Sequence, residues 1–270
     1  MTTLIRALRM WAILARAALR AEMQHRVHFF FGMLGGLAVQ ALGLVFIATI
    51  LSRFGDLGGW TFREILLLYG MRLTAHALWV IPFASLFQIT HVVRSAEFDR
   101  YLVRPLNPLI QLMTRRMTIV TIGHLVGGVA ILAAGMVSSG VDWTPVNVLL
   151  LAAALVGGAL TEMSFQLVLA SLAFRLHGAT EMMLTLDSVF NSFGNYPIKI
   201  FGPVARWSLT TVFPLAFAAY FPAAVLLGRT GELWVLPWIA VAAPAVGVIL
   251  AGLAYLFWQS QTRYYSSSGN

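Results

Sequence analysis

Long apolar runs make up most of the chain, and short polar or proline-rich breaks separate them. Six of the runs approach the roughly 20 residues that a helix needs to cross a bilayer. We therefore predict six membrane-spanning helices, at residues 28–52, 62–87, 117–137, 145–174, 180–196 and 234–259. The pattern predicts an all-α membrane protein that forms a single transmembrane domain, with a bundle at 28–259 and a tail at 260–270.

A further apolar stretch, near residues 197–229, is broken by Pro203, Pro214 and Pro222. Proline removes a backbone N–H and interrupts a helix, so this stretch does not fit one continuous span. Broken backbone at membrane depth is tolerated only where protein covers it. We predict short re-entrant helices in the outer leaflet, just before the last span.

Residues 1–27 predict an amphipathic helix that lies in the membrane interface. At about 100° per residue, Trp11 lies opposite a narrow stripe of arginines. The stripe consists of Arg6, Arg9, Arg16 and Arg20. Such a helix turns its apolar face into the bilayer and its arginines toward the lipid head groups. The alternative is a basic, frayed N-terminus.

Composition supports a chain that is bathed in lipid. Of 270 residues, 59% are hydrophobic and only 10% are charged, and the mean hydropathy is +0.82. An ordinary soluble domain has about 25% charged residues. The net charge is +8, but the arginines stand beside apolar runs, which fits anionic lipid rather than nucleic acid. The chain has no cysteine, which excludes disulfides and thiol chemistry.

The distribution of basic residues predicts the orientation. With both termini in the cytoplasm, the inner segments hold twelve arginines and the outer segments hold five basic residues. Cytoplasmic segments of membrane proteins are enriched in Lys and Arg. We therefore expect a multi-pass membrane protein with both termini in the cytoplasm.

Catalytic signatures are missing from the sequence. A phosphate-binding loop needs Gly-Lys-Ser/Thr, and the only lysine, Lys199, lies in an unrelated context. The six histidines lack metal-ligand spacing, and neither a His-Glu-x-x-His nor a Gly-x-Ser-x-Gly motif occurs. We expect no enzymatic activity and no bound cofactor or metal, so any ATP and Mg²⁺ would be used by a partner.

Four ionisable residues lie within the predicted spans: Arg72, His76, Glu162 and Asp187. A charge at mid-depth costs about 2.5–3.5 kcal/mol on insertion scales. Arg72 and His76 are four residues apart and share a helix face, so we expect this face to meet Glu162 or Asp187. The group either lines a substrate pathway or fixes helix packing, and the sequence leaves both open.

The loop after the second span predicts a short inner helix near residues 94–105. It ends at two prolines, and Phe98, Tyr101 and Leu102 share one of its faces. An aromatic knob with flanking charges suits docking into a groove on a cytoplasmic partner, although an ordinary solvated loop is the alternative. The candidate contact residues are Arg94, Glu97, Phe98, Asp99, Arg100, Tyr101, Leu102, Arg104 and Pro105.

Residues 96–106, AEFDRYLVRPL, resemble the inner-loop motif Gly-x-Leu-Asp-x-x-Leu-x-Arg-Pro-Leu of a bacterial subfamily of type II ABC transporter permeases. The proline-punctuated stretch from Asn195 to Arg229 and the turn at 58–64 are similar to the same proteins. Ala96 and Phe98 replace the usual Gly and Leu, which affects the turn before Asp99.

The resemblance implies an interfacial elbow helix, six spans, a coupling helix in the first inner loop and re-entrant helices before the last span. It implies a dimer, with a like chain or a related second permease, on two copies of a cytoplasmic ATPase. The implied function is efflux of a small amphiphilic, drug-like or lipid-like substrate. The alternatives are an ion-coupled secondary transporter, a membrane anchor and a membrane-embedded enzyme.

Overall fold

The structure of the protein, a computed structural model, describes Ile13, residues 26–115 and residues 120–267. Across these residues all regular structure is helical, and the predicted all-α membrane fold is confirmed. The predicted interfacial helix at 1–27 falls outside the described residues except at Ile13, Arg26 and Val27. Its candidate residues Arg6, Arg9, Trp11, Arg16 and Arg20 are all outside them.

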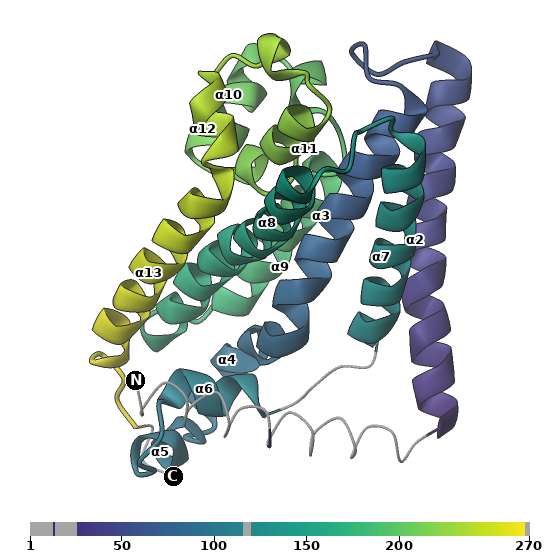
Figure 1. Ribbon diagram of the computed structural model, residues 1–270. Coiled ribbons are helices and arrows are strands. Elements are labelled where there is room, and N and C mark those ends of the chain that lie inside the picture. Colours follow the sequence, from purple (N-terminus) through teal and green to yellow (C-terminus); the bar gives the residue numbers. More distant parts are fainter. Residues whose placement is uncertain (1–12, 14–25, 116–119, 268–270) are drawn as a thin grey trace.

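Six helices run alternately up and down the length of the molecule (Figure 1). They are α2 (Arg26–Phe54), α3 (Phe62–Phe83), α7 (Val120–Ser138), α8 (Pro145–Ser171), α9 (Ala179–Phe193) and α13 (Ala243–Thr262). Helix α3 packs on α7 and α8, α2 packs on α7, and α13 packs on α8. Because α2 starts and α13 finishes at the same end, the described chain enters and leaves the bundle on one side (Figure 1).

Five segments of the described chain are long and apolar enough to cross a membrane: Phe30–Phe54, Phe62–Arg94, Thr121–Ser138, Pro145–Phe174 and Ala243–Thr262. Helix α9 has 15 residues, which gives about 22 Å and is shorter than the predicted span at 180–196. It packs on α8 and runs back toward α10 (Figure 1). It therefore occupies the place of the fifth span.

The proline-rich stretch forms short helices at one end of the bundle, which we call the α10 end (Figure 1). They are η3 (Ile198–Ile200), α10 (Pro203–Thr211), η4 (Leu215–Phe217), α11 (Tyr220–Leu226), η5 (Thr230–Glu232) and α12 (Pro237–Val241). The chain bends by 72° between α10 and the Leu215–Leu226 helix, as expected of a re-entrant segment. The predicted last span, 234–259, is divided, since α12 is separate from α13.

Short helices also gather at the opposite end, which we call the α5 end (Figure 1). They are η1 (Ala84–Gln88), α4 (Ile89–Arg94), α5 (Phe98–Leu102), α6 (Pro108–Met113) and η2 (Leu172–Phe174). The first three of these elements follow directly from α3. This end therefore holds the predicted coupling segment and the end of α13.

Glycines allow the long helices to approach closely. A Cβ atom at Gly70 of α3 would lie 2.4 Å from the Cα of Leu132 in α7. A Cβ atom at Gly157 of α8 would lie 2.4 Å from the Cα of Pro244 in α13. Small residues at such crossings bring backbones together where the hydrophobic effect does not drive helix association. The bundle is therefore packed along its two main contacts by residues without side chains.

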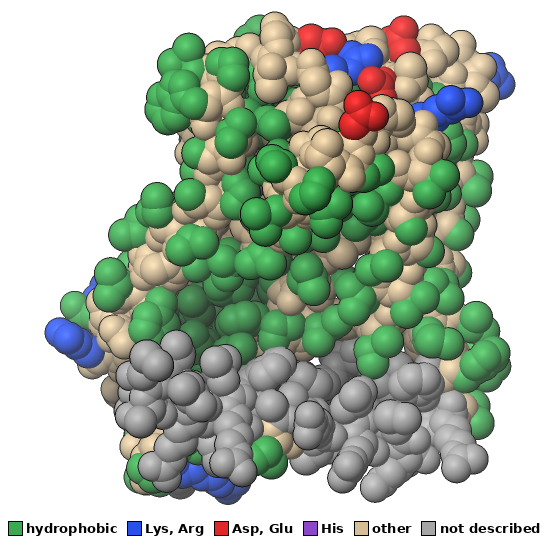
Figure 2. All heavy atoms as spheres, viewed as in Figure 1, with side chains coloured by type: hydrophobic (Ala, Val, Ile, Leu, Met, Phe, Trp, Pro, Cys, Tyr) green, Lys and Arg blue, Asp and Glu red, His purple; other side chains and the backbone are tan. Residues whose placement is uncertain are grey.

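Side chains divide the surface into a belt and an end. In Figure 2 hydrophobic side chains cover the middle of the visible face, acidic side chains gather at the α10 end, and basic side chains lie at both ends. Arg229 there forms ion pairs with Glu64 at 2.7 Å and Glu232 at 2.7 Å, and Lys199 pairs with Glu232 at 2.6 Å. The Arg229 guanidinium also lies 5.6 Å from the ring of the buried Trp60. These contacts join the turn before α3 to the re-entrant helices.

Candidate functional site

Helix α5 begins after an unusual turn. Ala96 has a φ of 56°, and it is the one non-glycine residue in the described chain with a positive φ. This left-handed conformation crowds the Cβ of an L-residue, and glycine adopts it freely. The turn separates α4 from α5 and lets the chain reverse at the α5 end. The position matches the glycine of the motif that the sequence resembles.

Glu97 ties α5 to the residues after α6. Its two carboxylate oxygens accept from Arg115, from Nη2 at 2.8 Å and from Nε at 3.0 Å. The Tyr101 hydroxyl also donates to Glu97, at 3.3 Å. The hydrogen bonds from Arg115 hold the pKa of the Glu97 carboxyl below its usual value. This geometry keeps the carboxylate charged and fixes the start of α5.

Gln111 holds the other end of the helix. Its side-chain amide, which is buried, donates to the carbonyl oxygens of Tyr101 and Leu106, both at 2.9 Å. Asn107 caps α6 by accepting from the Leu109 N–H at 2.9 Å. The loop between α5 and α6 is thus held from inside by side chains, so that α5 and α6 form one unit.

The two aromatic residues of the predicted docking face are buried in the structure, whereas Leu102 of the same face is exposed. Phe98 is 0% exposed and Tyr101 is 6% exposed, because both rings turn into the chain itself. The Phe98 ring lies 5.0 Å from the Phe174 ring and 5.0 Å from the Tyr265 ring, and 6.4 Å from Trp258. Burying the aromatic rings of this five-residue helix removes more apolar area from water than burying its other side chains would.

A different surface of the same segment is exposed, and we call it the α5 edge. Val103 is 83% exposed and Leu102 is 51% exposed, although both are apolar. The complete α5 edge consists of Arg100, Leu102, Val103, Arg104 and Pro105. Apolar side chains between two arginines at the end of a membrane bundle are typical of a protein contact.

Two further predicted contact residues make hydrogen bonds to distant segments of the chain. Arg94 donates from Nη2 to the carbonyl oxygen of His177 at 3.3 Å, which links the first loop to the second. Asp99 accepts from the Ser267 hydroxyl at 2.7 Å. Both residues are therefore engaged within the chain.

Inside the bundle, Arg72 and Glu162 form an ion pair at 3.1 Å, and both side chains are 0% exposed. The second carboxylate oxygen of Glu162 lies 2.9 Å from His76 Nδ1 and accepts from Trp79 Nε1 at 2.9 Å. The pair connects α3 to α8 and neutralises both charges. The face shared by Arg72 and His76 thus meets Glu162, which is one of the two partners that its spacing indicated.

Asp187 joins the group through an amide. Arg72 Nη2 donates to Asn191 Oδ1 at 3.4 Å, and Asn191 Nδ2 donates to Asp187 Oδ2 at 3.0 Å. Sequence reasoning did not single out Asn191, although its place four residues after Asp187 on α9 puts the two on one helix face. Three helices are therefore connected by one polar network.

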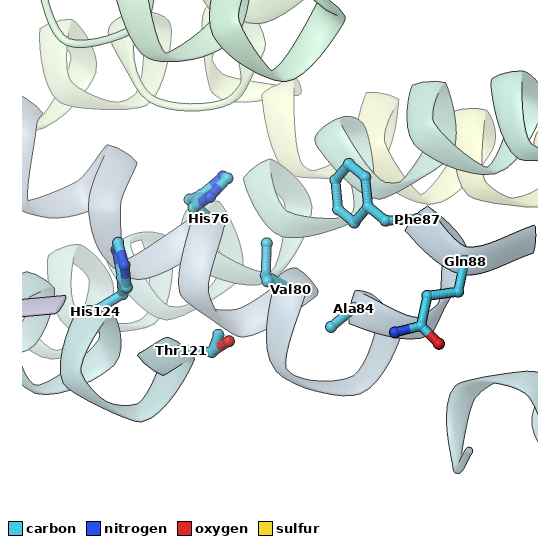
Figure 3. A pocket seen from close by; sticks show the side chains of 7 residues that line it. All are labelled: His76, Val80, Ala84, Phe87, Gln88, Thr121 and His124. Atoms are coloured by element: carbon cyan, nitrogen blue, oxygen red, sulfur yellow. The ribbon is translucent and has the colours of Figure 1, made fainter. Parts of the chain in front are cut away.

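His76 also borders a cavity of about 340 Å³ between α3, η1 and α7 (Figure 3). The cavity is lined by His76, Val80, Ala84, Phe87, Gln88, Thr121 and His124. His124 Nδ1 lies 3.0 Å from Gln40 Nε2 of α2. The cavity wall combines apolar side chains with the polar side chains of His76, Gln88, Thr121 and His124, whereas cavities that stay empty are lined by apolar side chains alone. It offers hydrogen-bonding groups to a ligand next to the buried ion pair.

Within the described residues, no group of three or more His, Cys, Asp or Glu side chains is arranged so that it could hold a metal ion.

The family model of the ABC-2 family transporter proteins matches residues 37–269. The chain belongs to the ABC-2 family. No match was found among the curated proteins. As a member of this family the chain is an ABC transporter permease, a multi-pass membrane component of a transporter.

The matched region of this ABC-2 permease includes the α5 edge, the buried ion pair and the cavity. No residue pattern indicates the aromatic cluster of Phe98, Phe174, Trp258 and Tyr265, because its members lie in three separate segments. The ion pair between Glu64 and Arg229 was also missed, since 165 residues separate its members. A residue pattern reports helix faces, but it does not report which faces meet.

Proposed function

We propose that this ABC-2 permease is the membrane subunit of an ATP-driven exporter in a bacterial inner membrane. It moves a small amphiphilic, drug-like or lipid-like substrate outward. Two copies of a cytoplasmic ABC ATPase bind and hydrolyse ATP with Mg²⁺, and a second permease subunit, either a like chain or a related paralogue, completes the dimer. The family match over residues 37–269 is the observation that carries this proposal.

The α5 edge is the contact that receives the ATPase. Leu102 and Val103 offer apolar area, and Arg100 and Arg104 flank it with positive charge. An ATPase groove with carboxylates on its rim would complement this surface. Arginine bias supports a cytoplasmic α5 end, because seven of the described arginines lie at this end, against five basic residues at the α10 end.

Force applied at the α5 edge reaches the bundle through fixed contacts. Arg115 and Gln111 hold α5 on α6, so the helix moves with its neighbours rather than alone. The chain η1–α4 continues from α3, whose far end carries the ion pair of Glu64 with Arg229. Closure of the ATPase dimer would thus tilt α3 and alter both ends of the bundle.

The buried network divides into a scaffold and a pathway wall. Arg72 and Glu162 are enclosed within a single chain and support helix packing. His76 keeps 13% of its side-chain surface and faces the cavity with His124 and Thr121. We assign the substrate pathway to this histidine-lined side, and Asp187 to the network behind it.

The proposed ATPase contact is tested by coexpressing the tagged permease with the ABC ATPase that is encoded next to its gene. Arg104→Glu together with Val103→Asp places two like charges against an acidic groove and should abolish copurification of the ATPase. The matched control, Arg53→Glu at the exposed end of α2, should retain it. ATP-linked transport in vesicles that is unchanged by the double variant, or transport without any ATPase, would contradict the proposal.

A further inference from the structure

The segment that follows the last span, Arg263–Ser267, contacts both inner loops of the permease. We propose that this segment, here called the tail, locks α5 to the second inner loop, so that one push by the ATPase moves α3, α8 and α13 together. The inference rests on the proposed function, and it assigns a positioning role to Tyr265.

Aromatic packing is the first tie. The Tyr265 ring lies 5.0 Å from Phe98 of α5 and 6.2 Å from Phe174 of η2. Trp258 of α13, which is buried, lies 5.2 Å from Phe174 and closes the cluster. Side chains packed at the density of a protein interior transmit displacement, because no free space absorbs it. Phe98 therefore cannot move toward the bundle without moving Tyr265 and Phe174.

Polar contacts fasten the tail on both sides of this ring. Ser267 donates to the Asp99 carboxylate of α5 at 2.7 Å. The guanidinium of Arg175, in the second inner loop, lies 3.5 Å from the centroid of the Tyr264 ring. A cation at this distance over an aromatic face is attracted by the ring. Tyr264 thus ties the tail to the second loop, and Ser267 ties it to the first.

The tail is the element that completes these ties. Without it, the two loops are still joined by Arg94 with the His177 carbonyl, by Thr180 with Thr90, and by Phe98 with Phe174. Tyr265 lies between Phe98 and Phe174, which are 76 residues apart in the sequence. This placement indicates a mechanical role for the Tyr265 side chain.

The experiment measures the distance between the two loops. The chain has no cysteine, so Ser95→Cys and Leu176→Cys, both at exposed positions outside the α5 edge, accept a pair of spin labels. We expect one narrow distance distribution in the permease alone, preserved when the ATPase complex is trapped with ATP and vanadate. Tyr265→Ala should broaden the distribution and reduce permease-dependent stimulation of the ATPase, while copurification of the ATPase is retained. Tyr265→Phe should behave as the wild type.

A reversible cross-link provides a second arm that leaves the aromatic cluster intact. Asp99→Cys with Ser267→Cys joins the tail to α5 on oxidation. If the tail moves with α5, ATPase stimulation is unchanged by the cross-link. Stimulation that is lost on oxidation and restored on reduction would overturn the inference, as would a narrow distribution in Tyr265→Ala. The distance in the permease alone needs no ATPase, so a failure of the wild type to bind any ATPase would contradict the proposed function only.

Discussion

Ala96 has a backbone conformation that does not suit its side chain. With φ at 56°, an L-residue loses about 1–2 kcal/mol relative to a right-handed position. Ala96→Gly should therefore stabilise the folded permease by up to about 1 kcal/mol, after the greater unfolded-state entropy of glycine is subtracted. Thermal unfolding of the detergent-solubilised chain measures this.

Ala84 provides the matched control, since its φ is −53°. Ala84→Gly should lower stability, because glycine gains nothing at a helical position. A destabilised Ala96→Gly variant would show that the turn before α5 is not left-handed in solution. The family motif indicated glycine at this position, but only the backbone geometry gives the reason for it.

The lowered pKa of the Glu97 carboxyl predicts that the stability of the folded permease depends on pH. Its pKa is lowered by the hydrogen bonds from Arg115, so the stabilisation is present above the unfolded pKa, about 4.3, and is lost as the pH falls through the folded pKa. At neutral pH Glu97→Gln should lower stability by up to about 1 kcal/mol.

Acidification should make the wild type and the Glu97→Gln variant equally stable. The melting temperatures of the wild type and Glu97→Gln are compared from pH 7 to pH 3, and their difference should decrease toward zero below pH 4. A difference that grows on acidification would show that Glu97 is protonated in the folded state.

At the scale of the helices, the buried ion pair holds α3 on α8. Removing one partner leaves an uncompensated charge, so Arg72→Met should destabilise the bundle by about 3–5 kcal/mol. Arg72→Met with Glu162→Met removes both charges and should recover most of the folded yield in size-exclusion chromatography.

The exposed Arg53 of α2 serves as the comparison, and Arg53→Met should have little effect. A double variant that is as unstable as the single one would show that the pair does more than balance charge. That result would favour a direct role of Arg72 and Glu162 in the substrate pathway.

The hydrophobic pattern predicted the helices better than their ends. Most helices of the bundle begin or finish within a few residues of the expected positions, since a span must be long and apolar. Helix α9 is shorter than expected because the apolar run continues past Phe193 into a turn at Gly194. The last span starts later than expected, at Ala243, because the prolines at 237 and 244 each open a separate helix.

For the molecule as a whole, the sequence located the candidate site but did not predict its partners. The spacing of Arg72 and His76 indicated a shared face, and the structure supplied Glu162 as its contact. Phe98 was assigned to a partner because an aromatic residue in a charged loop is typical of a docking knob. Its contacts with Phe174 and Tyr265 depend on how three distant segments fold together, which no local pattern reports.

The proposed function requires that the α5 edge face the cytoplasm and bind the ATPase. Val103→Cys introduces a single thiol at an exposed residue of that edge, in a chain that otherwise has none. A membrane-impermeant maleimide should label this thiol in inside-out vesicles and not in intact spheroplasts, and the bound ATPase should block the labelling. Labelling in intact spheroplasts, or labelling in inside-out vesicles that a saturating ATPase leaves unchanged, would contradict the proposed function.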